Sequence, residues 1–380
     1  MSFDDTLRTK AEEALRPIFE RNFLERGEIG ASVSVFLDGQ ELANLSGGFC
    51  EKEKLHPWTA ETLVPIWSAT KGVAAVTCLA VLDEAGLSLD DLVCDIWPAF
   101  AGGGKQDITF RQLLSHTSGL SALSGVVPIQ DAMAVANALE QQIPEFPSEG
   151  PQAYHARTFG FLLDEIVQHV TRGLSIGTCF REKFGDPMEL DFWIGLPETE
   201  LGRVATIYPG KMRLGEPQTP FLKAFTTKGT LTQRTFVSPQ GLNAVQDLNQ
   251  PETLQKGYAS MGGVGSARAL ASFYSMLAQG GIWQGRRLLS EAVIASLSET
   301  ISQQEDGVLC TQMAFGPGVM RDPLNADGSK ARQLFGSGLK AFGHPGAGGS
   351  LAFGDPGRRL SFAYVMNQME LGVLPNSKSL

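Results

Sequence analysis

The hydrophobic pattern near the start of the chain changes from helical to alternating. Residues 4–26 carry apolar side chains at roughly helical spacing, which predicts an amphipathic helix. Residues 29–48 contain two strand-like runs on either side of Asp38 and Gly39, and this dipeptide is a strong short-range signal for a hairpin. We therefore expect a helix followed by two antiparallel strands.

Residues 68–85 predict a helix of a different kind. Its body is apolar on nearly every side, and a helix that is hydrophobic all round lies in a core. After Gly86, residues 87–260 contain helical segments separated by connections rich in proline and glycine, and strand-like runs return only beyond them. This order predicts an α/β domain of residues 1–86 and 261–380, interrupted by a mainly helical domain, with the functional site between the two.

Composition narrows the class of protein. The chain of 380 residues is 43% hydrophobic and 19% charged, which is typical of a soluble globular protein with room for two lobes. Its net charge of −10 argues against nucleic acid as a partner, because phosphates attract basic surfaces. No apolar run is long enough to span a membrane, and the charged N-terminal segment lacks the apolar stretch of a secretory signal. Five scattered cysteines without a C-x-x-C pair then indicate free thiols in a reducing cytoplasm.

The start of the apolar helix carries the first candidate for chemistry. Ser68 and Lys71 are three residues apart, so they lie on one helix face. The N–H groups and dipole of a helix N-terminus favour negative charge on the serine, while burial lowers the pKa of the lysine and lets it accept a proton. Such a pair is a nucleophile activated without histidine. The alternative is a serine cap with a lysine extending outward, but the residues after Lys71 offer little polar surface.

Three other patterns look chemical but have simpler explanations. Ser337 and Lys340 repeat the spacing, yet glycines flank the serine and no helical run follows. Residues 262–269 are glycine-rich but lack the ending of a phosphate loop, which favours a turn into a helix. Glu165 and His169 share a helix face, but no second histidine completes a metal set, so we expect no metal or cofactor.

Four segments, taken together and in this order, resemble the serine β-lactamase and penicillin-binding-protein-like family. They are residues 68–71, 108–120, 153–170 and 342–356, and the closest branch is the class C-type, or family VIII, carboxylesterases. The resemblance extends from about residue 30 to 367. It implies an α/β (α+β) fold of the β-lactamase/transpeptidase type, with an antiparallel sheet flanked by helices and an α-rich inserted lobe.

The resemblance assigns roles to the first and third segments. Ser68 matches the family's nucleophile, Lys71 its paired base, and Tyr154 the tyrosine of its Y-x-N motif, which here ends in Ala156. A phenol beside an ammonium has a lowered pKa, so we expect Tyr154 to relay a proton to the leaving alcohol. His155 either tunes the site or lines it as a substrate-binding residue.

The family's K-T-G motif reads His344, Pro345 and Gly346 in this chain. In β-lactamases the Lys and Thr help to hold the carboxylate of the antibiotic, and neither replacement reproduces that pair. Gly346 should let substrate approach the strand, with His344 beside it, and the N–H of Ala347 should join that of Ser68 in an oxyanion hole. A proline in this strand predicts either an edge strand or a position without a ladder hydrogen bond, which fits a strand whose free edge faces the substrate. In the second segment, His116 is expected to be a structural hydrogen-bonding residue.

These features favour a hydrolase that cleaves small-molecule carboxylic esters with short to medium acyl chains through a Ser68 acyl-enzyme. A β-lactamase, a D-amino-acid peptidase or amidase, and an acyltransferase are alternatives on the same fold. A non-catalytic binding protein is disfavoured by the intact Ser–Lys–Tyr set, and an α/β-hydrolase by the absence of G-x-S-x-G. Whether Lys71 or Tyr154 takes the first proton stays open, because the two titrate as a coupled pair.

The C-terminal segment departs from the family pattern. The family closes with a helix beside the N-terminal one, whereas residues 367–380 follow the last strand-like run without a helical pattern. We therefore expect the apolar face of helix 4–26 to need other cover, which a homo-oligomer contact could provide.

Overall fold

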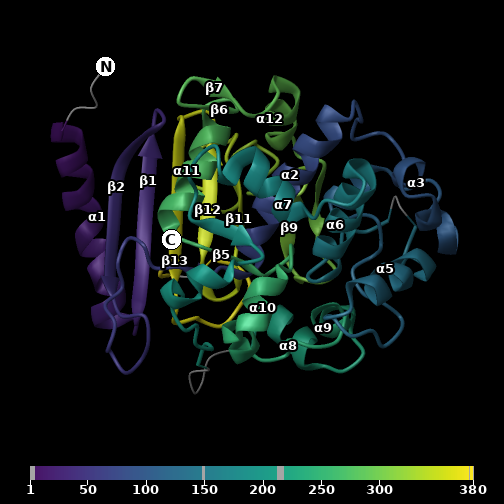
Figure 1. Ribbon diagram of the computed structural model, residues 1–380, viewed down its shortest axis with the longest axis horizontal. Coiled ribbons are helices and arrows are strands. Elements are labelled where there is room, and N and C mark those ends of the chain that lie inside the picture. The colour runs from purple at the N-terminus through teal and green to yellow at the C-terminus, as the bar shows by residue number, and fades with distance from the viewer. Residues whose placement is uncertain (1–4, 148–149, 212–217, 376, 380) are drawn as a thin grey trace.

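The centre of the molecule is an eight-stranded antiparallel sheet, whose strands run roughly vertically in Figure 1. The structure is a computed structural model and describes residues 5–147, 150–211, 218–375 and 377–379. In spatial order the strands are β2 (Gln40–Gly48), β1 (Gly30–Leu37), β13 (Leu360–Met366), β12 (Leu351–Asp355), β11 (Phe342–Pro345), β10 (Met320–Arg321), β9 (Gln312–Phe315) and β8 (Ser302–Glu305).

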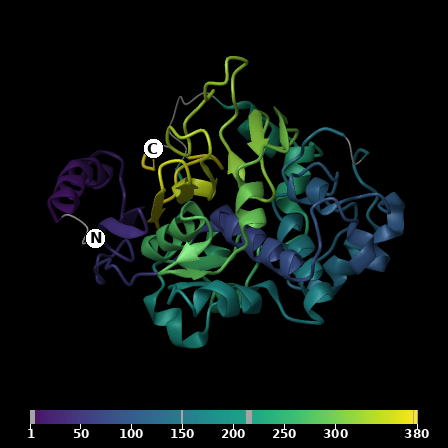
Figure 2. The same cartoon turned by 90° about the horizontal axis from the view of Figure 1, so that it is seen from above.

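Helices cover both faces of this sheet and form most of the remaining molecule (Figures 1 and 2). They are α1 (Asp5–Glu25), α2 (Thr70–Glu84), α3 (Val93–Ile96), α4 (Phe110–Leu114), α5 (Ala132–Gln141), α6 (Thr158–Thr171), α7 (Ile176–Phe180), α8 (Pro220–Thr226), α9 (Leu231–Val237), α10 (Pro251–Lys256), α11 (Ala267–Ala278) and α12 (Glu291–Leu297). This is the β-lactamase/transpeptidase-like, mixed α/β fold that the sequence predicted.

The alternation of side chains along β13 explains the layers. Ala363 and Val365 pack into the main core with α11, whereas Tyr364 and Met366 pack on the opposite face with Phe19 of α1. Successive residues of a strand point to opposite faces, so one strand supports a helix layer on each side. The helix expected at residues 4–26 is therefore confirmed as α1, except for residue 4, which lies outside the described residues.

The hairpin prediction is also confirmed. β1 and β2 pair antiparallel up to Leu37 and Gln40, and the two residues between them are Asp38 and Gly39, with φ angles of 51° and 77°. Positive φ at both positions is what a type I′ turn requires, and its twist matches the twist of the strands. Further along, the expected turn at residues 262–269 leads into α11, preceded by a short strand that the pattern did not reveal.

The apolar helix runs through the middle of the molecule as α2. Every residue from Thr70 to Leu82 is buried, including Lys71. Its neighbours are α6 and α7 on the helical side and β11 of the sheet. A helix with helical and sheet neighbours on opposite sides has no face for solvent, which accounts for the lack of polar side chains.

A second, small sheet supports the segment that leads into α2. Its strands are β3 (Val64–Pro65), β5 (Gly263–Gly265) and β4 (Phe192–Ile194), with β5 in the centre. Residues 87–260 contain α3 to α10 together with β4, so this sheet joins all three parts of the chain. The division into two domains stays a prediction.

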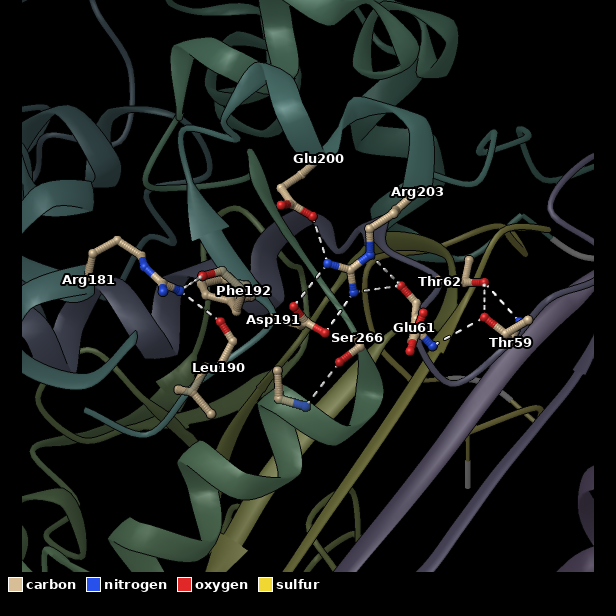
Figure 3. A network of polar contacts seen from close by, with 11 residues as sticks. Thr59, Glu61, Thr62, Arg181, Leu190, Asp191, Phe192, Glu200, Arg203 and Ser266 are labelled. Atoms are coloured by element: carbon tan, nitrogen blue, oxygen red, sulfur yellow. Dashed lines mark hydrogen bonds and ion pairs between the residues drawn. The ribbon is translucent and has the colours of Figure 1, made fainter. Parts of the chain in front are cut away.

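Arg203 anchors the loop before β3, as Figure 3 shows. Its guanidinium donates to both carboxylate oxygens of Asp191 at 3.1 and 2.7 Å, and to Glu200 at 2.7 Å. It also donates twice to the carbonyl oxygen of Glu61, at 3.1 and 2.9 Å. All five N–H groups of the planar guanidinium therefore have acceptors. They hold the segment of Glu61 against that of Asp191, which fixes the position of the chain that leads to Ser68.

The strand that contains Pro345, β11, lies inside the sheet. β11 is not an edge strand, because it lies between β12 and β10; however, β10 pairs with it only at Gly343, so His344 and Pro345 lie beyond that pairing. Proline is tolerated there because its missing N–H is not needed on that side.

No helix in the described ranges is both long and apolar enough to cross a membrane, and the five cysteines are unpaired as predicted.

The described C-terminal residues, 367–375 and 377–379, contain no helix but cover part of α1. Lys378 forms a buried ion pair with Glu28 at 3.2 Å, and its carbonyl oxygen accepts a hydrogen bond from Asn22 at 2.9 Å. Ile18 nevertheless keeps 52% of its surface exposed. A homo-oligomer through this face stays a prediction.

Candidate active site

Ser68 lies in a tight turn at the entrance to α2. The turn is a 3-10 helix, Trp67–Ala69, that runs directly into Thr70, so Ser68 precedes the α-helix and is not its first residue as expected. Trp67 has a φ of 51°, which a bulky side chain rarely adopts. The hydroxyl of Ser68 is 3.1 Å from the amine of Lys71, so the structure brings the sequence-predicted pair into contact.

The Lys71 side chain is fully enclosed. Its Nζ is 2.8 Å from the carbonyl oxygen of Ala156 and 2.7 Å from that of Ser260. Burial lowers the pKa of this amine well below its usual value, and among the described residues no carboxylate counteracts that shift. When this amine is neutral it has two hydrogens and one lone pair; the two carbonyls can then take the hydrogens, which leaves the lone pair for Ser68. The alternative of a lysine extending to solvent is wrong.

Tyr154 completes the contact around the serine. It lies in an extended stretch four residues before α6, rather than at a helix start, and its hydroxyl forms a hydrogen bond with Ser68. The expected lowering of its pKa is wrong: burial raises the pKa of the phenol, and the hydrogen bond with Ser68 only partly opposes this. The charge of Asp306 adds to the rise, whereas Lys71, whose Nζ lies 5.0 Å from the ring centre, is not among the causes of the shift.

His155 and His116 form a buried pair behind Tyr154. Nδ1 of His116 accepts the main-chain N–H of His155 at 3.2 Å, so the ring nitrogen of His155, 2.9 Å away, must be the donor. The other nitrogen of His155 then accepts from Ser118 at 3.0 Å and from the N–H of Leu120 at 3.2 Å. Both nitrogens of His155 have protein partners, so the assignment as a substrate-binding residue is corrected: it supports the Tyr154 segment instead. His116 has the structural role expected for it.

The ring of His344 is buried beneath the site. Its Nδ1 is 2.8 Å from the carbonyl oxygen of Pro345, so that nitrogen donates, and Nε2 carries a lone pair without a partner among the described residues. The ring centre lies 6.0 Å from that of Tyr154. Burial lowers the pKa of His344 to about 3, which keeps the ring neutral. The structure therefore places His344 against Tyr154 rather than at an open substrate surface.

Gly346 brings the third motif close to the nucleophile turn. A Cβ at this position would lie 2.1 Å from the carbonyl oxygen of Ile66, two residues before Ser68, so only glycine permits the approach. In the described part of the chain, neither the N–H of Ser68 nor that of Ala347 donates to a backbone carbonyl. Two free N–H groups on adjoining turns can hold an oxyanion.

The remaining candidates are separate from this centre. Ser337 and Lys340 are exposed in a loop, as their glycine-rich surroundings predicted. Within the described residues, no group of three His, Cys, Asp or Glu side chains has an arrangement that could hold a metal. The site thus holds a serine hydroxyl between an amine whose pKa burial lowers and a phenol whose pKa burial raises.

The chain is similar to known proteins over most of its length. The model of the family described as Beta-lactamase matches residues 8–377. The chain belongs to the β-lactamase family. An esterase/beta-lactamase, LipL of Mycobacterium tuberculosis, is 30% identical over 346 residues, covering 90% of this chain and 77% of LipL.

Two solved structures are similar throughout. A penicillin-binding protein homolog from Caulobacter crescentus has a TM-score of 0.84 at 33% identity, covering 97% of this chain and 94% of its own. A family VIII carboxylesterase has a TM-score of 0.84 at 32% identity, covering 96% and 93%. This member of the β-lactamase family is a serine hydrolase on that fold.

Sequence reasoning missed groups that act through the main chain or through distant contacts. The carbonyl oxygen of Ser260, 189 residues from Lys71 in the chain, carries no signal of residue type. Ser118 and Asp306, which support the Tyr154 segment, lie in ordinary turn-like sequence. No local pattern could have identified them.

Proposed function

We propose that this protein hydrolyses carboxylic esters of small molecules through an acyl-enzyme at Ser68. The observation that carries the proposal is the contact of the Ser68 hydroxyl with the Lys71 amine, 3.1 Å apart, in surroundings that lower the pKa of the amine. A buried amine with a lowered pKa can act as a base, which supports Lys71 as the group that takes the first proton. The esterase names of LipL and the family VIII structure support the same conclusion.

The proposed reaction has two halves. The proton of Ser68 passes to Lys71, and Oγ attacks the ester carbonyl, whose oxygen accepts from the N–H groups of Ser68 and Ala347. As the C–O bond breaks, Tyr154 gives its proton to the departing alcohol and regains one from the protonated Lys71. Water then attacks the acyl group, its proton passing to Lys71, and the acid leaves as Ser68 recovers its hydrogen.

The third motif favours neutral esters over β-lactams. At the position of the family's lysine, His344 is neutral and its unpartnered nitrogen can only accept a hydrogen bond. A carboxylate also only accepts, so the two repel where an ammonium would attract. The proline at position 345 removes the hydroxyl that would provide the second contact.

We expect kcat/KM for a 4-nitrophenyl ester to exceed that for nitrocefin by roughly 10²-fold or more, because the carboxylate of nitrocefin meets no cation at His344. Both reactions can be followed by absorbance with the same enzyme sample. Equal turnover of the two substrates would contradict the ester assignment and favour the β-lactamase alternative.

Tyr154→Phe should reveal the general acid through the leaving group. With an ethyl ester we expect kcat/KM to fall roughly 10²-fold or more, because ethoxide needs a proton to depart. With the 4-nitrophenyl ester of the same acid the loss should be much smaller, because nitrophenolate leaves without one. Hydrolysis of matched esters by purified variant and wild type measures this ratio, and an unchanged ratio would remove Tyr154 from the acid role.

A further inference from the structure

Asp306 is a buried carboxylate that the reaction described above does not use. Its side chain lies directly behind Tyr154, in the turn after β8, with no exposed surface. Oδ1 accepts the main-chain N–H groups of Tyr154 at 3.2 Å, Val308 at 2.9 Å and Leu309 at 2.8 Å. Oδ2 accepts from the amide of Gln152 at 3.0 Å.

These contacts favour the ionised form of Asp306. Burial raises the pKa of its carboxyl group, but each of the four hydrogen bonds lowers that pKa. The three main-chain N–H groups on Oδ1 can only donate, and they favour a carboxylate oxygen over a protonated one. The carboxylate is thus held against the main chain of Tyr154, whose N–H is 3.2 Å away.

The segment that carries Tyr154 is held by hydrogen bonds on two sides, and Asp306 lies on one of them. On its side, Gly307 N–H donates to the carbonyl oxygen of Gln152 at 2.9 Å. On the other side, His116 accepts from His155 at 3.2 Å, and its carbonyl oxygen accepts the N–H of Ala153 at 2.9 Å. The segment has no helix or strand of its own, so these partners set the position of Tyr154.

We infer that Asp306 is a positioning residue for the general acid: through the N–H of Tyr154 and the amide of Gln152 it fixes the main chain that carries the phenol. The inference rests on the proposed function, in which Tyr154 protonates the leaving alcohol. The charge of Asp306 is among the causes that raise the pKa of Tyr154.

The test uses Asp306→Asn, which keeps the size of the side chain and removes its charge. The amide of Gln152 can turn over to meet the new NH₂ group, because its other partner, the Ser302 hydroxyl at 2.7 Å, both donates and accepts. We expect kcat/KM for an ethyl ester to fall at least about tenfold, a part of what a general acid contributes. The 4-nitrophenyl ester of the same acid should be affected much less, because it does not need the acid.

A double-mutant cycle separates positioning from general damage. In the Tyr154→Phe background, Asp306→Asn should not change the ratio of kcat/KM for the ethyl ester to kcat/KM for the 4-nitrophenyl ester, because the acid that Asp306 positions is already absent. An equal loss on both esters in the wild-type background, or no loss, would overturn the inference. Failure of Tyr154→Phe itself to change the ratio would instead overturn the acid role in the proposed function.

Asp322→Asn is a matched control. Asp322 is also buried and also accepts two main-chain N–H groups, from Leu334 at 2.8 Å and Phe335 at 3.1 Å, but it pairs with Lys330, and none of these partners belongs to the segment that carries Tyr154. Any loss it causes should be equal for both esters. If Asp306→Asn does not fold, Gln152→Leu can replace it, because it removes one donor from the same carboxylate. Its kcat/KM for the ethyl ester must then fall relative to that for the 4-nitrophenyl ester, to a smaller extent than expected for Asp306→Asn. Without that fall the inference fails.

Discussion

Ser68→Ala is expected to lower kcat for ester hydrolysis by roughly 10⁴-fold or more, because the variant has no oxygen to form the acyl-enzyme. The fold should be unaffected, since Ser68 lies in a tight turn and its side chain contacts only Lys71 and Tyr154 among the contacts described above. The measurement is the rate of hydrolysis of a 4-nitrophenyl ester by equal amounts of wild type and variant.

The same variant can be tested without relying on turnover. Brief exposure to an activated phosphonate should add one covalent group to the wild type, detected by intact-mass spectrometry, and none to Ser68→Ala. Ser337→Ala is the control, because it removes the exposed serine of the second Ser–x–x–Lys pair and should leave both the adduct and the rate unchanged. An adduct that persists in Ser68→Ala would show that the nucleophile is another residue.

Lys71→Met is expected to have the second-largest effect, a loss of roughly 10²- to 10⁴-fold in kcat, because the serine loses its base. Methionine fills a similar buried volume but cannot accept a proton. Lys105→Met provides a comparison: Lys105 is also buried and donates to the carbonyl oxygens of Glu140 at 3.0 Å and Gln142 at 2.7 Å, away from the site. Its substitution should leave the kcat of the folded protein close to that of wild type.

Wild type and Lys71→Met also test whether the Lys71 amine is neutral in the folded protein. The pKa of Lys71 is lowered in the fold and is about 10.4 in the unfolded chain. Between these two values the unfolded chain binds one proton more, so the free energy of unfolding rises with pH by up to about 1.4 kcal/mol per pH unit, and the gain is complete above the unfolded pKa. Wild type should therefore gain stability relative to Lys71→Met between pH 7 and pH 10, as urea unfolding would measure. A difference that does not change with pH would mean that Lys71 is charged in the fold.

Much of the architecture could be predicted because it is encoded locally. The periodicity of residues 4–26, the dipeptide at Asp38 and Gly39, and the apolar run after Lys71 each specify an element from neighbouring residues alone. Ser68 and Lys71 meet for the same reason, since their spacing on one turn brings them together whatever surrounds them. The four motifs in order then gave the family, which the match over residues 8–377 supports.

The chemistry of the site depended on contacts that no local pattern contains. The sequence suggested that an ammonium at Lys71 lowers the pKa of Tyr154, whereas burial raises it. It placed Pro345 at an edge or at a non-bonding position, and the pairing of β10 with β11 at Gly343 alone agrees with the second. The lowered pKa of Lys71 follows from burial, and its amine lies against carbonyl oxygens 85 and 189 residues away in the chain.

The amino-acid sequence by itself determined the helices, the hairpin, the nucleophile pair and the family, because these depend on the order and spacing of side chains. Only the tertiary structure brought two carbonyl oxygens onto the Lys71 amine, placed His155 in support of Tyr154, and put Asp306 against the main chain of Tyr154. Protonation and hydrogen-bond direction are set by the dielectric and the partners around a group, and folding alone brings those partners together.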